Sequence, residues 1–363
     1  MRRVPVLDGW RGVAIALVIA HHVGQNLSVD EAVYYAQDVT RFGQVGVDIF
    51  FGLSGLLITR LLLQEQSASG SFSLPQFYIR RTFRILPPML AYIAAYTVLG
   101  LWTSNVEFVS SLLFFRNYVP TSITGFSSGH LWSLAVEEHF YLLWPGLLAL
   151  SGPRRAKRLA VGLALSVGLW RILAPHVAPG LFPGVSLGLR TDLRLDALLW
   201  GCVAACVLHT MKEDQTLAAL LPSPIWIVAV ILVPLSIQFY EPVATIWMAL
   251  LIPLLLTWTL LYRESRISRV LAWVGFAWLG RISYSLYLWQ QLFLTPGWQT
   301  TSLWWRHWPW NLAAALVAAT LSYHLLEKPL IAVGRRLSDH YQKKRSLPSC
   351  LQAGTAAITQ GVR

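Results

Sequence analysis

The apolar stretch LDGWRGVAIALVIAHH near the N-terminus contains three groups that can do chemistry, Arg11 and the adjacent pair His21 and His22. Residues 11 positions apart on a helix differ by about 20° in direction and about 16 Å in height. Arg11 and His22 therefore share one face, whereas His21 points about 100° away and is predicted to pack against a neighbouring helix. Asp8 lies on the Arg11 face, where it is placed to hold the guanidinium. A hydrogen bond across a helix interface is the simpler role for His22, but the polar residues elsewhere in the chain favour a functional one.

Carboxylates occur inside two further apolar stretches. Asp48 lies in GVDIFFGLSG, and Glu137 and Glu138 are adjacent in HLWSLAVEEHFYLLWP. A charge at the centre of a bilayer costs at least ~2.5–3.5 kcal/mol, so each needs a partner, a polar cavity or a function. We expect one of the two glutamates to pair with an arginine and the other to point into a cavity. Together with the alternating charges of residues 191–196, these residues predict a polar mid-membrane cavity.

A third cluster is basic. In YIRRTFRILPP, Arg81 and Arg84 are spaced i, i+3 on one face of a predicted short helix that Pro87 and Pro88 end. Two roles are open for this face. The arginines either anchor the protein to anionic membrane lipids, or clamp a phosphorylated ligand together with Arg11, which lies at the same depth. The planar guanidinium favours the second role because it makes bidentate contacts with phosphate.

The composition shows what must position these groups. Of 363 residues, 55% are hydrophobic and 13% are charged. A soluble domain of this composition lacks polar surface, so the chain is predicted to be an integral membrane protein. The net charge of +12 lies in short basic clusters between apolar runs. This pattern follows the positive-inside rule and argues against nucleic-acid binding.

The predicted fold is all-α, with about ten transmembrane helices enclosing the polar cavity. The apolar runs that can span a bilayer lie near residues 10–27, 44–63, 87–103, 130–151, 159–174, 192–210, 224–240, 243–262, 279–296 and 309–331. With this count the basic clusters fall on one side, so both termini are predicted to be cytoplasmic. Residues 104–129 are too short to cross unaided and are predicted to be re-entrant or interfacial. Residues 1–331 form one predicted membrane domain, and residues 332–363 a basic, disordered cytoplasmic tail.

Seven motifs in order resemble the membrane-bound acyltransferase-3 family, which includes O-antigen, exopolysaccharide, peptidoglycan and macrolide O-acyltransferases. They extend from Leu7 to about Leu330 and read LDGWRGVAIALVIAHH, GVDIFFGLSGLLIT, FYIRRTFRILPP, HLWSLAVEEHFYLLWP, RLDALLWG, GRISYSLYLWQ and YHLLEKPL. The resemblance implies a ten-helix enzyme of the bacterial cytoplasmic (inner) membrane that moves an acyl group, usually acetyl, to a hydroxyl. It implies acyl-CoA, in particular acetyl-CoA, as co-substrate, no tightly bound cofactor or metal, and a carbohydrate or lipid-linked glycan as acceptor.

The resemblance also assigns donor-binding residues. The family's basic-residue-to-histidine motif falls on Arg11 and His22, the pair that helical geometry selects, and its Arg-x-x-Arg motif falls on Arg81 and Arg84. The three arginines are thereby implied to hold the phosphates of CoA at the cytoplasmic rim. The rise of about 16 Å from Arg11 to His22 suits the long pantetheine arm.

The catalytic group implied by the resemblance is His22, acting as general base on the acceptor hydroxyl. The acidic motif falls on Glu137 and Glu138, and either of these or Asp48 is implied to orient the imidazole, as a carboxylate supports a catalytic histidine. A transient acyl-histidine is an open alternative. Many family members have histidine at the position of Gln290, so we do not expect a proton relay there.

Two other functions remain open from the sequence. The acceptor is alternatively a small hydroxylated molecule such as a macrolide. Intramembrane charges also mark transport paths, so a transporter or flippase for an anionic or lipid-linked saccharide is the alternative from another class. No SGNH-type esterase domain follows residue 331, so we expect this domain either to complete the transfer or to hand the group to a separate partner.

Overall fold

The computed structural model describes residues 4–26, 29–210, 241–295, 304 and 307–346, and these residues form helices and no strand. The helices are α1 (Pro5–Asn26), α2 (Val29–Ser69), α3 (Leu74–Val98), α4 (Asn105–Leu112), α5 (Leu131–Val177), α6 (Thr191–Thr210), α9 (Glu241–Leu261), α10 (Arg266–Leu271), α11 (Val274–Phe293), α12 (Trp310–Ser322) and α13 (Lys328–Ser346), with a π turn at Tyr323–Glu327 before α13. The predicted all-α fold is confirmed for the part of the chain described.

Six stretches of the described residues are long and apolar enough to cross a membrane. They are Pro5–Gln25, Phe42–Ser69, Phe126–Val177, Leu187–Thr210, Val243–Leu261 and Trp310–Gln342. Helix α5 contains two helical segments joined at Gly152, whose φ is 69°, and so accounts for two of the predicted spans. The predicted span 224–240 lies outside the described residues, and the total of ten spans stays a prediction.

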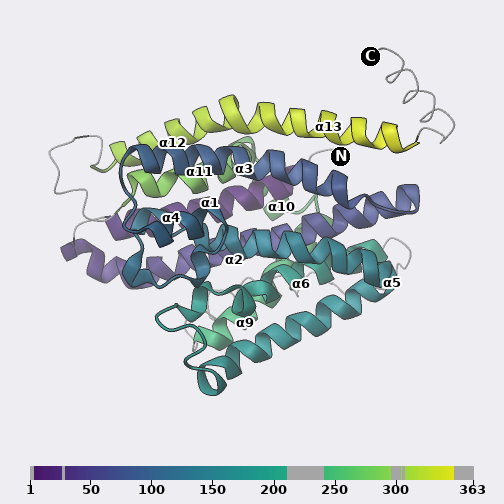
Figure 1. The fold of residues 1–363 in the computed structure, drawn as a ribbon, viewed down its shortest axis with the longest axis horizontal. Coiled ribbons are helices and arrows are strands. Elements are labelled where there is room, and N and C mark those ends of the chain that lie inside the picture. Colours follow the sequence, from purple (N-terminus) through teal and green to yellow (C-terminus); the bar gives the residue numbers. More distant parts are fainter. Residues whose placement is uncertain (1–3, 27–28, 211–240, 296–303, 305–306, 347–363) are drawn as a thin grey trace, which may run out of the picture.

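The long helices run roughly parallel or antiparallel to one another (Figure 1). Helix α1 packs between α2 and α11, α6 packs against both α2 and α5, and α13 lies along α3. Beyond residue 152, the second segment of α5 folds back along the opposite edge of the bundle. Helix α1, which carries both Arg11 and His22, is therefore covered by α2 and α11.

Glycines allow the two central helix crossings to be close. A Cβ at Gly280 of α11 would lie 1.8 Å from the Asp8 carbonyl oxygen of α1, and one at Gly55 of α2 would lie 1.8 Å from the Leu198 carbonyl oxygen of α6. Membrane helices lack a hydrophobic driving force between them and rely on such close backbone contact. The α1–α11 and α2–α6 pairs are therefore fixed at these glycines.

The prediction that Pro87 and Pro88 end a short helix is wrong, because α3 continues through both to Val98. Proline removes an N–H donor and clashes with the preceding turn. In packed membrane helices, however, neighbouring side chains bind the carbonyls that proline disturbs. The carbonyls that lose their helical donor here are those of Phe83 and Arg84, four residues before each proline. Next to them, the hydroxyl of Tyr284 on α11 donates to the Ile85 carbonyl at 2.7 Å and holds this stretch of α3 against α11.

The predicted disordered tail is also wrong over residues 332–346, which belong to helix α13. This helix packs closely on α3, since a Cβ at Gly334 would lie 2.6 Å from the Cβ of Phe83. Its basic residues made the segment look like a solvated tail, and its apolar residues Val333 and Leu337 are exposed. Its small residues Gly334 and Ser338 are buried, however, and Arg80 of α3 donates to the Ser338 hydroxyl at 3.0 Å. Residues 347–363 lie outside the described residues.

Residues 104–129 fold around the fully buried carboxylate of Glu107 on α4. This carboxylate accepts hydrogen bonds from the Thr103 backbone N–H at 2.8 Å, the Thr103 hydroxyl at 2.6 Å, the Gly125 N–H at 2.9 Å and the Ser128 hydroxyl at 2.5 Å. Burial raises the pKa of the Glu107 carboxyl, but these hydrogen bonds outweigh burial and hold the pKa below its usual range. Glu107 therefore ties the segment into a compact unit, and its position at a membrane surface stays a prediction.

Candidate functional site

A pocket of about 90 Å³ collects most of the residues predicted to act on the donor. Arg11 of α1, Arg81 and Arg84 of α3 and Glu137 of α5 all line it, together with apolar and hydroxyl side chains of α2 and α11. The structure thus brings together residues that are up to 126 positions apart in the sequence. Its walls combine charged and hydroxyl groups with apolar side chains, and the polar cavity at mid-membrane stays a prediction.

The charged groups of this pocket are held in defined positions. Arg11 donates to the Asp8 carboxylate at 3.2 Å, which confirms the role expected for Asp8. Glu137 accepts from the Ser54 hydroxyl at 2.9 Å and from the Tyr141 hydroxyl at 3.0 Å. The Arg81 guanidinium lies over the Tyr141 ring, 4.8 Å from its centroid, a favourable cation–π contact.

A larger pocket of about 690 Å³ adjoins the first, and Arg11 and Arg84 line both. Six cationic side chains line it, whereas two acids, Asp8 and Glu327, do so. The six are Arg11, Arg60, Arg84, Arg281, Lys328 and Arg335. We call this pocket the basic basin. Its excess of positive charge suits a polyanionic ligand, because guanidinium and ammonium groups bind phosphate oxygens strongly.

His22 lies outside both pockets, in a separate buried cluster on the far side of the first pocket's wall. Its Nε2 atom is 2.9 Å from the side-chain nitrogen of Gln291 on α11. The side-chain oxygen of Gln291 lies 3.0 Å from the backbone nitrogen of His130 and 2.7 Å from its Nδ1. The hydroxyl of Tyr287, which lines the first pocket, donates to the His130 carbonyl at 2.9 Å. A chain of contacts through His130 and Gln291 therefore connects the pocket wall to His22.

The structure does not bring the predicted carboxylates to His22. Asp48 is 1% exposed and pairs with Arg194 of α6 at 2.5 Å. Glu137 lines the first, 90 Å³ pocket, which we call the donor-side pocket after the role predicted for its arginines. One oxygen of Glu138 is buried without a hydrogen-bond partner among the described residues. The group that contacts His22 Nε2 is the amide of Gln291 instead. His21 packs on α2 as predicted, since a Cβ at Gly43 would lie 2.6 Å from the His21 ring.

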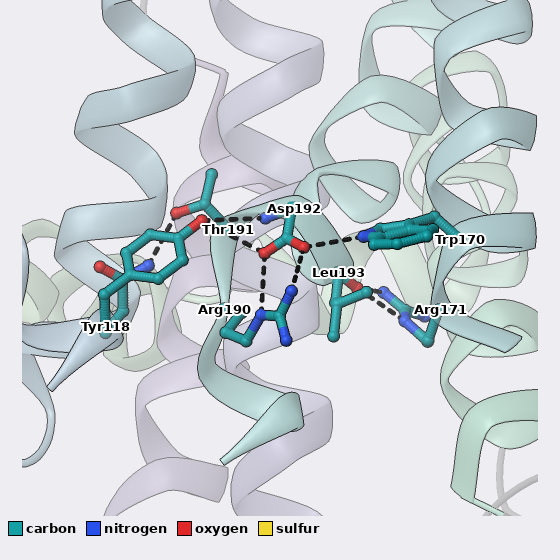
Figure 2. Close-up of polar contacts among 8 residues, drawn as sticks. Tyr118, Trp170, Arg171, Arg190, Thr191, Asp192 and Leu193 are labelled. Carbon is teal, nitrogen blue, oxygen red and sulfur yellow. Dashed lines mark hydrogen bonds and ion pairs between the residues drawn. The ribbon is translucent and has the colours of Figure 1, made fainter. Parts of the chain in front are cut away.

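The alternating charges of residues 191–196 hold helices together. Figure 2 shows Asp192 accepting hydrogen bonds from Arg190, Trp170 and Tyr118, while Arg171 donates to the Leu193 carbonyl. Arg171 also pairs with Asp196 at 2.5 Å. These contacts join the end of α5 to the start of α6. The prediction that these charges line a cavity is therefore wrong, because Asp192, Arg194 and Asp196 are paired with Arg190, Asp48 and Arg171.

With this geometry established, the comparison with known proteins identifies the family. Residues 4–326 match the model of the acyltransferase-3 family, which is described as an acyltransferase domain. This chain belongs to the acyltransferase-3 family. The resemblance stated from the motifs is therefore confirmed, and the class of transferase is one that moves groups other than aminoacyl groups.

Two similar proteins are named as peptidoglycan O-acetyltransferases. The chain is 29% identical to the peptidoglycan O-acetyltransferase OatA of Listeria monocytogenes, over 90% of this chain and 56% of that protein. It is 30% identical to the putative peptidoglycan O-acetyltransferase YrhL of Bacillus subtilis, over 92% of this chain and 56% of that protein. The chain thus spans just over half the length of these relatives. No solved structure matches it.

Several site residues of this acyltransferase-3 chain were missed from the sequence. His130 and Tyr287 belong to quoted motifs and Gln291 directly follows one, but none of the three is charged and the predicted site was built on charged residues and His22. Arg60 and Lys328 of the basic basin stood in predicted spans or at their ends. The sequence signal that could have found them is the polar face of each predicted helix, the face that carries uncharged polar residues as well as charged ones.

Proposed function

We propose that this chain is a membrane O-acyltransferase that moves an acetyl group from cytoplasmic acetyl-CoA to a hydroxyl of a cell-envelope carbohydrate or lipid-linked glycan. It works in the bacterial cytoplasmic membrane with both termini in the cytoplasm, and His22 is the general base. The observation that carries the proposal is the order of sites along α1: the basic basin and the donor-side pocket share Arg11, and His22 follows 11 residues further on.

The donor fits this order by charge and by length. CoA carries its phosphates at one end and its thioester at the other, joined by the extended pantetheine arm. The basic basin offers six cations for the phosphates, and Arg81 and Arg84 stand at the entrance to the narrower pocket. A rise of about 16 Å from Arg11 to His22 matches a ligand that is anchored at one end and reacts at the other.

The chemistry needs one base and one polarised carbonyl. His22 removes the proton of the acceptor hydroxyl as its oxygen attacks the thioester carbonyl, and the imidazolium then returns that proton to the departing CoA thiolate. The transfer forms one C–O bond, breaks one C–S bond and leaves the enzyme unchanged. Tyr287 and Ser133 lie between the pocket and the His22 cluster, so their hydroxyls are placed to bind the carbonyl oxygen as negative charge develops on it.

The proposed acceptor rests on the relatives, which are named for peptidoglycan. A carbohydrate presents hydroxyls that a buried histidine can deprotonate without any further cofactor. The donor-side pocket and the basic basin meet the needs of an acyl-CoA enzyme rather than those of a saccharide transporter, because their cations gather at one end of the site instead of lining a path across it.

The test compares two adjacent histidines in the protein reconstituted into liposomes with radiolabelled acetyl-CoA and peptidoglycan fragments. His22→Ala should lower the rate of label transfer at least ~100-fold, the usual contribution of a general base. His21→Ala removes a neighbouring imidazole that packs against Gly43 and should retain most of the rate. The reverse ranking would refute the assignment of the base, and transport of an unlabelled saccharide without any labelled product would refute the acyltransferase itself.

A further inference from the structure

Gln291 connects two buried histidines through the two ends of its amide. Its oxygen faces His130 and its nitrogen faces His22. Gln291 is 4% exposed, His22 is 8% exposed and His130 is 2% exposed, so the orientation of each group is decided by the others rather than by water.

The backbone of His130 decides which end of the amide is which. A backbone N–H can donate but not accept, and the atom 3.0 Å from it must therefore be the carbonyl oxygen of Gln291. The same oxygen lies 2.7 Å from His130 Nδ1, so Nδ1 carries a proton. Turning the amide over would set its NH₂ group against the backbone N–H of His130, which can only donate, and leave that buried N–H unpaired.

The orientation of Gln291 then fixes the state of His22. The amide nitrogen that faces His22 Nε2 at 2.9 Å can donate but not accept. Nε2 must hold its lone pair, and the proton of the neutral ring must be on Nδ1. The titratable groups that face His22 are His21 on its own helix and His130 at the start of α5. The His21 ring lies edge-on to that of His22, with the centroids 4.8 Å apart, and the hydrogen bond at Nε2 comes from Gln291.

We infer that Gln291 is the positioning residue that keeps the lone pair of His22 on Nε2, the nitrogen that takes the proton from the acceptor hydroxyl. The inference rests on the proposed function. Like the carboxylate of a Ser-His-Asp triad, the amide selects the tautomer of the histidine, but it does so from the reacting nitrogen, whereas the carboxylate contacts the opposite one. It also marks the site of the acceptor: Nε2 has one lone pair, so the hydroxyl displaces the amide N–H of Gln291 from it on binding and then donates to Nε2 in its place.

An isosteric substitution separates this role from packing. Gln291→Glu keeps the shape, but its carboxylate accepts from both histidines and draws the His22 proton onto Nε2, where it blocks the base. Gln291→Leu loses the hydrogen bonds and leaves both tautomers accessible. We expect Gln291→Glu to lower kcat at least ~100-fold with the KM for acetyl-CoA unchanged, and to be more harmful than Gln291→Leu, because a wrong tautomer costs a triad about 10⁴-fold.

Two measurements complete the test. Nitrogen-15 NMR of histidine-labelled protein should show His22 protonated on Nδ1 in the wild type and on Nε2 in Gln291→Glu, whether or not the protein transfers acetyl groups. Gln76→Glu, at another glutamine that is 4% exposed and lies on α3, is the matched control and should retain kcat. If Gln291→Leu is the more harmful variant, or if the His22 tautomer is the same in wild type and Gln291→Glu, the inference is wrong. Loss of the proposed function would appear separately, as full activity of His22→Ala.

Discussion

The buried ion pair between Asp48 of α2 and Arg194 of α6 gives the sharpest test of what the intramembrane charges do. Its atoms are 2.5 Å apart, and the side chains are 1% and 3% exposed. The pair crosses the α2–α6 contact that Gly55 makes close. We therefore expect Asp48 to stabilise the fold and not to take part in the chemistry.

The magnitude follows from what each variant leaves behind. Removing one partner of a buried pair costs about 3–5 kcal/mol, because the other charge stays buried and unpaired. In Asp48→Ala the remaining Arg194 still lies near Asp196, which attracts it, so we expect the lower end, about 3 kcal/mol of unfolding free energy. The double variant Asp48→Ala, Arg194→Met leaves neither charge and should cost about 2 kcal/mol less than the sum of the single variants.

The assay is unfolding by SDS in mixed micelles, followed by the fluorescence of the 17 tryptophans. Glu65→Ala is the control, because Glu65 and Arg80 form an ion pair 3.2 Å long whose side chains are 26% and 28% exposed, and such pairs contribute less than about 1 kcal/mol. The reasoning is refuted if Asp48→Ala unfolds within about 1 kcal/mol of the wild type. If that stable variant also fails to transfer acetyl groups, Asp48 belongs to the chemistry.

Three further predictions test the close crossing, the loop and the basin. Gly280→Ala should destabilise the protein by more than about 3 kcal/mol, since its Cβ would overlap the backbone of α1. Gly146→Ala is the control, because nothing lies within 4 Å of its Cβ, and it should unfold as the wild type does in the same SDS titration. The pKa of Glu107 in the folded protein lies below its ordinary value. The ionised carboxylate therefore stabilises the fold fully at pH values above the ordinary pKa, and this stabilisation disappears as the pH falls through the lowered pKa of the folded protein. The Tm of wild type in detergent should therefore fall towards pH 3 more steeply than that of Glu107→Gln, and parallel curves would contradict this. Arg60→Gln and Lys328→Gln should each raise the KM for acetyl-CoA roughly three- to tenfold with little change in kcat, and the rise in KM should be smaller at high salt. An equally large fall in kcat would show that these residues do more than bind the phosphates of the donor.

Much of the donor side of the site was predictable from spacing alone. Arg11 and His22 are on one helix, so the 3.6-residue period fixes their relative direction. The i, i+3 spacing of Arg81 and Arg84 likewise puts both on one face, and the structure has both lining the same pocket. Local geometry carries such relations because the helix itself holds them.

Relations between helices were not predictable in this way. A charged residue in an apolar run signals that it needs a partner, but the partner of Asp48 is 146 positions away on α6, and the sequence offered several equally suitable arginines. Helix α3 continues through two prolines where it packs against α11 and α13, and residues 332–346 are helical where they pack against α3.

The sequence by itself determined that this is an all-helical membrane protein of the acyltransferase-3 family, and it selected His22 over His21, because composition, motif order and helical period are local properties. Only the tertiary structure decided that an amide, Gln291, contacts His22 while Asp48 joins α2 to α6. A buried charge or imidazole accepts any partner that satisfies its hydrogen bonds. Which partner does so is settled by the packing of helices at their glycine crossings, and no single helix contains that information.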